Sequence, residues 1–521
     1  MAACAAGCAA SANSTAECPP TAHCVPGQPV PQDLELGVEL IPPATSPFVR
    51  QELPAVRFDD TGSASLTLTP GVMVHGQILD EQGKAPVQAQ VIFSRASGIA
   101  GLPKLVTQVP TDAGGTFAVL LPPLAYEMRV LPVGDLEAVY PPLTTLLSPT
   151  NAGEFPAPVV VRMQRGIQLD GRVTSALAVG IASVPVRAVD GDHNDQILST
   201  TAVTNTDGGF TLWLSQAPDA RSVAHVRVIA SLSNALTLSR EINGSTLGVN
   251  AARVELHGPA LPDLQTFVVK VVGKSQAGTP DPLQGARVDA TTVVSLPTAD
   301  TLATFAASTN TYDGAGHAAL QLIPAGDGNR SYTVTVTPPE GLPYGNASFT
   351  LQVGPTGGVL STLALDPRPS VLGTLTGPDG ALLRGVLVTG TQLDPPDGAT
   401  PTLARSTSGL DGSFILHVDN GRYDFDVVPP LTASLARLSL ADRDVSGTLE
   451  LGNIQLPTPL GATVALAGRD GKPVLGIEVR LYATGYRSCP SAEPPGCPVA
   501  RLRADGTTGS DGQASVLLSP N

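Results

Sequence analysis

Residues 371–430 decide the fold of this chain. They open with the alternating run VLGTL (371–375), turn at GPDG (377–380) and continue with a second apolar run, GVLV (385–388). The segment LDGSFIL (410–416) follows, and the stretch closes with GRYDFDVVP (421–429). Apolar residues at every second position between Asp-Gly turns are typical of short antiparallel strands. The stretch therefore predicts a small β-sheet unit.

The same unit recurs along the chain. Alternating runs that open a unit begin at Val74, Leu169, Val268, Val371 and Ala462, and their first residues lie 95, 99, 103 and 91 positions apart. Asp-Gly turn segments recur in step, with their aspartates at Asp112, Asp207, Asp313, Asp411 and Asp511. Two independent landmarks that keep one period indicate tandem repeats.

The turn segments have a direct physical reading. Gly after Asp supplies the positive φ of a tight hairpin turn, and the Asp side chain is expected to hold that turn. The apolar residue that follows, as in Phe117, Phe210 and Phe414, is expected to start the next strand facing the core.

Glycines and tyrosines mark two further positions of the unit. Gly76, Gly171 and Gly373 lie inside strands and predict a close approach of another group, whereas Lys270 and Val464 are expected to take that place in the third and fifth units. The closing strands are headed by Tyr126, Tyr332 and Tyr423. Each ring is expected to pack on the core while its hydroxyl group hydrogen-bonds at the edge.

With these motifs together, the units resemble the carboxypeptidase regulatory-like domain, a seven-stranded transthyretin-like β-sandwich that is also grouped with bacterial Ig-like folds. The family pattern is V-x-G-x-V, a D-x-x-G-x-P-hydrophobic turn, G-A-x-V, T-D-x-x-G-x-F and G-x-Y-x-V. The first unit matches it at residues 74–78, 80–87, 111–117 and 126–130. The fifth unit matches at 470–474 and 476–479, and the second and third match more loosely. The resemblance covers about 450 residues, and its motifs specify a fold rather than a chemistry.

The resemblance implies an all-β fold: an elongated tandem array of about five seven-stranded transthyretin-like or Ig-like β-sandwiches. The expected parts are a disordered, lipoprotein-like leader (1–32), an N-terminal β segment (33–70), and sandwiches at 71–165, 166–262, 263–367, 368–458 and 459–521. No Tyr-headed strand follows residues 516–520, so the last sandwich is expected to be truncated, with an open edge. Completion of that edge by a partner strand remains the alternative.

Composition and charge narrow the class of protein. Aromatic residues make up only 4% of the chain, so its cores must be built from Val, Leu, Ile and Ala, which suits several small sheets. The net charge of −15 is spread thinly and disfavours nucleic acid and anionic membrane surfaces as partners. No apolar run is long enough to span a bilayer as a helix.

The cysteines indicate an extracytoplasmic location. Cys8 ends an Ala-rich start that resembles the end of a bacterial lipoprotein signal, so lipidation at Cys8 or a plain disordered leader are both open. Cys18 and Cys24 lie close together in one Pro-rich loop, and Cys489 and Cys497 in another, which favours two local disulfides over a zinc site. The expected location is the outer membrane, as a lipoprotein, or the cell surface or medium.

Motifs that carry catalysis are missing from the sequence. It contains no His-Glu-x-x-His pair, Gly-x-Ser-x-Gly elbow, P-loop or dinucleotide fingerprint. The acidic cluster at 190–195 resembles the start of a calcium loop, but it lacks the glycine and the glutamate that such a loop needs, so a solvated loop is the better interpretation. The sequence predicts a protein that is not an enzyme and has neither a metal nor a cofactor.

The leading hypothesis is therefore a non-catalytic surface protein: a spacer, adhesion or interaction scaffold that acts as a monomer on an unknown protein or polysaccharide. Contact with a membrane would come only from an N-terminal lipid. The alternatives are a carbohydrate-binding protein or an accessory subunit of a secreted hydrolase. Trp213 is the single tryptophan, and it is the candidate platform for a sugar ring.

Overall fold

A computed structural model describes residues 34–520 except for short gaps. The gaps are 151–152, 193–195, 216–223, 233–234, 248–252, 261–262, 275–279, 295–299, 326–328, 340, 394–402, 431 and 488–496. The predicted leader, with Cys8, Cys18 and Cys24, lies outside the described residues, as does Cys489.

We number the first four complete sandwiches 1 to 4 in chain order. Domain 4, with its strands between residues 370 and 455, shows the repeating unit in its simplest form. One sheet has three strands in the order β29-β26-β32, and the other has four in the order β28-β27-β30-β31. The first strand, β26, pairs antiparallel with β29 and parallel with β32, the last strand of the unit. Its strands are β26 (Ser370–Thr376), β27 (Leu387–Gln392), β28 (Leu403–Thr407), β29 (Ser413–His417), β30 (Gly421–Val428), β31 (Leu438–Val445) and β32 (Leu449–Gln455).

Domain 1 repeats this seven-stranded arrangement, with sheets β10-β4-β7 and β6-β5-β8-β9. Its strands are β4 (Val72–Leu79), β5 (Ala89–Arg95), β6 (Leu105–Pro110), β7 (Thr116–Leu121), β8 (Tyr126–Pro132), β9 (Leu143–Leu147) and β10 (Val159–Arg162), with the 3-10 helix η1 (Gly134–Ala138) before β9.

Domains 2 and 3 have the same arrangement and share one sheet. Strand β16 of domain 2 pairs antiparallel with β21 of domain 3, so their four-stranded sheets join into one of eight strands. Domain 2 contains β11 (Ile167–Thr174), β12 (Pro185–Asp190), β13 (Ala202–Val203), β14 (Gly209–Leu214), β15 (His225–Ser231), β16 (Leu236–Asn243), the 3-10 helix η2 (Gly244–Thr246) and β17 (Val254–His257). Domain 3 contains β18 (Gln265–Gly273), β19 (Asp281–Pro282), β20 (Arg287–Val294), β21 (Leu302–Asn310), β22 (His317–Leu322), β23 (Arg330–Thr337), β24 (Ala347–Val353) and β25 (Gly358–Leu365).

The last domain is built from both ends of the described chain, and we call it the split domain. Its sheets are β3-β33-β36 and β2-β1-β34-β35. The N-terminal part supplies β1 (Glu35–Ile41), β2 (Gln51–Arg57) and β3 (Ser63–Thr67). The C-terminal part supplies β33 (Leu460–Ala467), β34 (Glu478–Arg487), β35 (Cys497–Thr507) and β36 (Gln513–Leu518).

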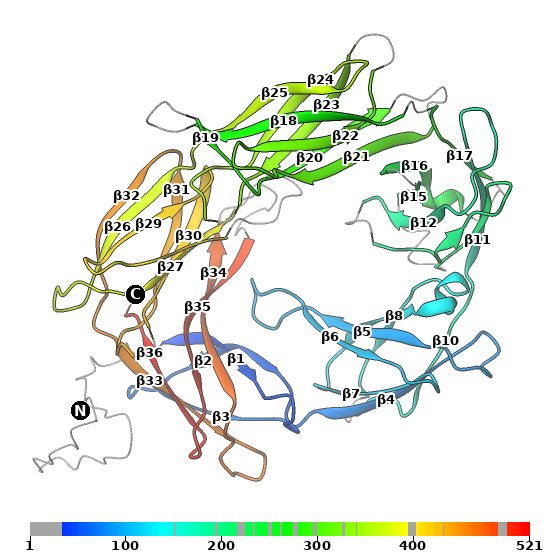
Figure 1. Cartoon of the computed structure of the whole chain (residues 1–521). Helices are drawn as coiled ribbons and strands as arrows, with labels where there is room; N and C mark the ends of the chain where they lie inside the picture. Colours follow the sequence, from blue (N-terminus) through cyan, green and yellow to red (C-terminus); the bar gives the residue numbers. More distant parts are fainter. Residues whose placement is uncertain are drawn as a thin grey trace, which may run out of the picture.

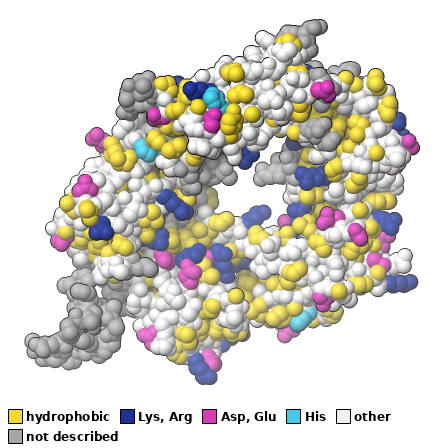
Figure 2. All heavy atoms as spheres, viewed as in Figure 1, with side chains coloured by type: hydrophobic (Ala, Val, Ile, Leu, Met, Phe, Trp, Pro, Cys, Tyr) yellow, Lys and Arg dark blue, Asp and Glu magenta, His cyan; other side chains and the backbone are white. Residues whose placement is uncertain are grey.

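Because the two parts share one domain, the five sandwiches follow one another around a closed ring (Figure 1). Figure 2 shows an opening at the centre of the ring, with Lys and Arg side chains around its rim. The prediction of an elongated all-β tandem array is confirmed as a succession of sandwiches, but its path curves back to its start. The prediction of a truncated last unit with an open edge is wrong, because β1, β2 and β3 complete both of its sheets.

The expected close approach at the strand glycines is found, and the cross-strand register gives its reason. A Cβ atom added to Gly76, Gly171 or Gly373 would lie 2.2, 2.1 or 2.8 Å from the phenylalanine ring on the paired strand. In the split domain the same place is taken, as predicted, by Val464, which faces Ala514.

In domain 3 the prediction of Lys270 at this place is wrong. The register puts Val269 there, facing Ala318, and both residues are fully buried. Each domain therefore fills this point of its core with one large and one small side chain, in either order.

The turn aspartates hold their turns in four of the five domains. In domain 1, Asp112 accepts hydrogen bonds from the backbone N–H groups of Gly114 and Thr116, both at 2.9 Å, and Gly115 has a φ of 68°. Domain 2 differs from the prediction, because Asn205, not Asp207, accepts the equivalent bonds, from the N–H groups of Asp207 and Gly209. Asparagine offers the same amide-accepting oxygen as aspartate does.

The three closing-strand tyrosines are buried, as predicted. The Tyr332 hydroxyl donates to the Ile323 carbonyl oxygen at 3.0 Å and accepts from the Ile323 N–H at 2.9 Å. Burial raises the pKa of all three phenols, and those of Tyr332 and Tyr423 reach about 12. These side chains therefore serve the core.

Candidate ring-closing site

The site that closes the ring is the contact between the donor, which we define as residues 34–68, and the acceptor, residues 460–518. Strand β1 pairs antiparallel with β34, so that Val38 faces Leu481 and Leu40 faces Val479. Strand β3 pairs parallel with β33 over five residue pairs. The donor thus adds strands to both sheets of the acceptor.

The donor also supplies seven of the eighteen buried residues of a hydrophobic core. Its buried side chains in that core are Leu36, Val38, Leu40, Val56, Phe58, Ala64 and Leu68. Burial of each large apolar side chain contributes about 1.5–3 kcal/mol, so these contacts supply on the order of 10 kcal/mol before the loss of chain entropy is subtracted. The acceptor alone would leave the other side of this core in water.

The donor strands take the places of the last three strands of domain 4. There β30 pairs with the central strand β27, β31 pairs with β30, and β32 runs parallel to β26. Here β1 pairs with β34, β2 pairs with β1, and β3 runs parallel to β33. The topology is the same, and only the covalent link that would run from β36 to β1 is absent.

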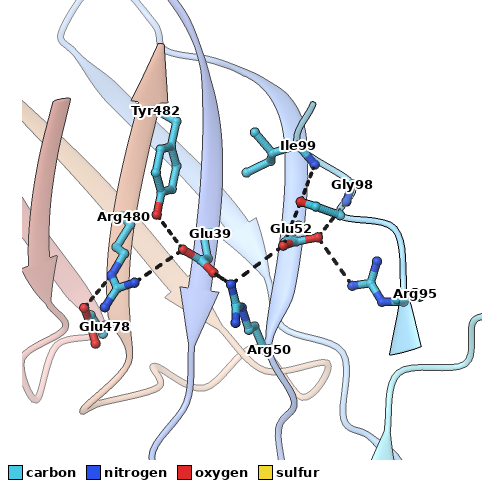
Figure 3. Close-up of polar contacts among 10 residues, drawn as sticks. Glu39, Arg50, Glu52, Arg95, Gly98, Ile99, Glu478, Arg480 and Tyr482 are labelled. Atoms are coloured by element: carbon cyan, nitrogen blue, oxygen red, sulfur yellow. Dashed lines mark hydrogen bonds and ion pairs between the residues drawn. The ribbon is translucent and has the colours of Figure 1, made fainter. Parts of the chain in front are cut away.

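A buried carboxylate joins the two parts on the other face of β1. Glu39 is fully buried, and its carboxylate accepts a hydrogen bond of 2.7 Å from the Tyr482 hydroxyl (Figure 3). Arg50 forms an ion pair with it from the donor, and Arg480 approaches to 3.8 Å from the acceptor. Burial, followed by the hydrogen bond to Glu39, raises the pKa of Tyr482 to about 12, so the phenol remains a donor at neutral pH.

A second carboxylate fixes domain 1 against the donor. The side chain of Glu52 on β2 accepts hydrogen bonds from the Gly98 N–H at 2.6 Å and the Ser97 hydroxyl at 3.0 Å, and Arg95 lies 3.5 Å away (Figure 3). Gly98 and Ser97 belong to the loop 96–104, which joins β5 to β6. The donor therefore contacts the domain that follows it in the chain as well as the acceptor.

The same loop packs closely on the split domain. Ile99 is fully buried although it belongs to neither hydrophobic core, and a Cβ at Gly37 on β1 would lie 3.2 Å from it. Gly101 has a φ of 93°, and a Cβ there would lie 2.5 Å from the backbone nitrogen of Ala500 on β35. Both glycines are required for this close packing.

The joint between domain 4 and the split domain is also formed by ion pairs. The Arg501 guanidinium donates to Asp424 at 3.0 Å, and Arg437 lies 2.8 Å from Asp505. Burial, followed by the charge of Arg501, lowers the pKa of Arg503 on the same strand. Both joints of the split domain thus combine backbone proximity with charged pairs.

Trp213 lies on the outer face of β14, opposite the buried Leu212 and Leu214, and is partly exposed. The Arg165 guanidinium lies 5.8 Å from the centre of its ring. On the same sheet face, the Thr211 hydroxyl donates to Asp170 at 2.6 Å beside an open hollow of about 840 Å³. Trp213 is therefore an outward-facing ring in polar surroundings and not a core residue.

Cys497 is disulfide-bonded. No other cysteine lies among the described residues, and its pairing with Cys489 remains a prediction, as do the Cys18–Cys24 pair and lipidation at Cys8. In the acidic cluster, Asp192 accepts bonds from the backbone and ring nitrogens of His225. The ring bond, followed by the charge of Asp192, raises the pKa of that imidazole. Among the residues described, no group of three metal-ligating side chains is found.

Sequence reasoning missed the role of residues 34–68. The signal was present, because the last unit ends three strands early while an extra alternating segment precedes the first unit. No helix within the described ranges is long and apolar enough to cross a bilayer.

No protein-family model and no curated protein matches this sequence. Among solved structures, "The Bacillus anthracis TIE protein" is similar at 11% identity over 72% of this chain and 69% of that chain, with a TM-score of 0.17. The shaft pilin SpaA from Lactobacillus rhamnosus GG is similar at 14% identity over 37% and 97%, with a TM-score of 0.22. A streptococcal ancillary pilin is similar at 12% identity over 55% and 98%, with a TM-score of 0.20. These TM-scores are too low to support any argument about this chain.

Proposed function

We propose that this protein is a non-catalytic extracytoplasmic scaffold, made of five carboxypeptidase regulatory-like domains that are held in a ring. The observation that carries the proposal is the shared split domain, since it joins the first and last parts of the described chain in one fold and so closes the ring. Such a ring presents binding loops to a protein or a polysaccharide at the cell surface. The disulfide at Cys497 supports an oxidising compartment.

The location is tested by fractionating the native cells and treating whole cells with a protease. We expect the protein in the envelope or the medium, with the chain cleaved while the cells remain intact. If Cys8 carries a lipid, Cys8→Ser moves the protein from the membrane fraction to the soluble fraction. A chain that is found only inside the cell with a free Cys497 thiol would sink the proposal.

The shape is tested by small-angle scattering on the purified chain. A ring with a central opening gives a smaller maximum dimension than five domains placed end to end, and it gives a distance distribution with a broad single maximum. A distribution that extends to the length of five domains in line would contradict the closed scaffold.

A second candidate function is glycan binding at domain 2. The observation that favours it is the outward-facing ring of Trp213, which lies on the same sheet face as Asp170 and Thr211. Sugars stack on such rings while neighbouring polar groups bind their hydroxyls. A glycan array on the wild type and Trp213→Ala tests this, with Tyr312→Ala, which removes another exposed aromatic side chain, as the control.

A further inference from the structure

We propose that the donor of one molecule completes the split domain of a second copy, so that this chain forms head-to-tail assemblies by strand exchange. The partner is a second copy of this chain, and the surface it fits is the core face of the acceptor, which the chain's own donor covers in this structure. This inference goes beyond the proposed scaffold function and does not depend on where the protein resides.

The connectivity of the split domain permits exchange between copies. No backbone link joins β36 to β1, so nothing covalent requires the donor and the acceptor of one split domain to come from one molecule. Among the described residues, the donor and the acceptor meet through strand pairing, apolar packing and the polar contacts of Glu39. A donor from a second copy makes every one of them without change.

The donor is attached to domain 1. It is followed at once by domain 1, and Glu52 and Gly37 fix it against the loop 96–104 of that domain. The donor and domain 1 therefore present β1–β3 as one preformed unit at one end of the molecule. The acceptor follows domain 4 at the other end.

The symmetry of the contact decides what kind of assembly would form. Each copy has one donor and one acceptor, and these surfaces differ, so the contact between copies is heterologous. Heterologous contacts generate closed rings when the rotation closes and open filaments when it does not. The structure shows that one copy can close on itself, and an opened copy has an unpaired end to offer to the next.

The protein concentration sets the balance between closed monomers and assemblies of exchanged copies. A donor meets its own acceptor at an effective concentration set by the geometry of the four domains between them, whereas a free second copy is present only at its bulk concentration. Closed monomers therefore dominate in dilute solution. Exchange dominates when opened chains meet at high local density, as on a crowded surface.

The test uses two full-length variants that cannot close on themselves. Val38→Asp disables the donor, and Leu481→Asp disables the acceptor, because these two fully buried residues face each other across β1 and β34. Each variant retains one intact half. When the two are mixed, the intact donor of the Leu481→Asp chain meets the intact acceptor of the Val38→Asp chain.

We expect each variant alone to be a monomer by light scattering after size exclusion, and the equimolar mixture to give a 1:1 complex with the mass of two chains. Circular dichroism of each variant must retain the strand signal of the other four domains. Two Val38→Asp preparations with different labels, mixed in the same way, form no complex. If the complementary mixture also stays monomeric, exchange between copies is excluded.

A second measurement uses the wild type and does not depend on those variants. Unfolded chains are refolded at low and at high protein concentration and separated by size. We expect monomer at low concentration and a ladder of dimers and longer assemblies at high concentration, with Cys497 kept oxidised. A refolded product that is monomeric at every concentration would overturn the proposal.

Discussion

At the scale of single residues, the five domains fill one equivalent position of the core with two different pairs of side chains. Domains 1, 2 and 4 place glycine opposite phenylalanine, whereas domain 3 and the split domain place valine opposite alanine. The combined side-chain volume at this point decides the fit, and not the identity of either residue. A glycine there is consequently dispensable if its partner shrinks.

We expect Gly373→Val to destabilise domain 4 by about 1–3 kcal/mol, because the new side chain overlaps the Phe414 ring. Adding Phe414→Ala recreates the pair found in the split domain and is expected to recover at least half of the loss. Native-state hydrogen exchange of β26 and β29 measures both effects. Additive losses in the double variant would contradict the compensation.

The turn aspartates link the hairpins to pH. The hydrogen bond from the Thr116 hydroxyl, followed by that from the Thr116 backbone N–H, lowers the pKa of Asp112 below its ordinary value of 3.8. Because the folded pKa is the lower one, the stabilisation is complete above pH 3.8 and is lost as the pH falls through the folded pKa.

We therefore expect the turn at 112–116 to lose protection in acid, and Asp112→Asn to keep it. Asn205 in domain 2 shows that an amide oxygen can hold the same turn. Hydrogen exchange of this segment between about pH 2.5 and 5, corrected for the intrinsic rate, gives the comparison. Equal pH dependence of the two proteins would show that the Asp112 carboxylate does not control the turn.

At the scale of strands and loops, the sequence predicted elements well and their partners poorly. Alternation and Asp-Gly turns are local signals, and the N-terminal segment that the sequence assigned to β structure, 33–70, does contain strands, among them Glu35–Ile41 and Ser63–Thr67. Their partners lie at the other end of the chain: Glu39 and Tyr482 are 443 residues apart. No periodicity in the sequence encodes a pairing between strands so far apart. The wrong prediction for Lys270 has the same cause, because only the register with the paired strand shows which residue faces the core.

The loop 96–104 provides a test of the joint that leaves both cores intact. We expect Ile99→Asp to remove the loop from β1 and β35, because a charge replaces a fully buried side chain at their contact. Exchange protection should fall in the loop and in β35, while β33 and β36 keep theirs. Leu146→Asp, at an exposed leucine of domain 1, is the matched control. Unchanged protection in the loop would mean that Ile99 does not hold the joint.

At the scale of the whole molecule, neighbouring domains are joined in two ways, and the split domain extends the series into domain 1. Edge strands β16 and β21 pair directly, whereas Asp424 and Glu52 hold neighbouring domains at two other joints. The donor therefore both completes a core and fixes the curvature of the ring.

We expect a chain that lacks residues 34–68 to lose the fold of the split domain alone. The acceptor would expose the other half of its core, bind a dye specific for apolar surfaces and lose exchange protection in β33–β36. Domains 1 to 4 are expected to keep theirs, because their cores contain no donor residue. Full protection of β33–β36 in the shortened chain would show that the acceptor folds by itself.

The split domain has a consequence for the order of biosynthesis. Its N-terminal strands leave the ribosome well before their partners, which follow 400 residues later at the Ser63–Thr463 pair. At translation rates of roughly 5–20 residues per second, the early strands wait on the order of 20 to 90 seconds for their sheet. Until then β1–β3 carry unpaired edges, which are open to premature association with other strands.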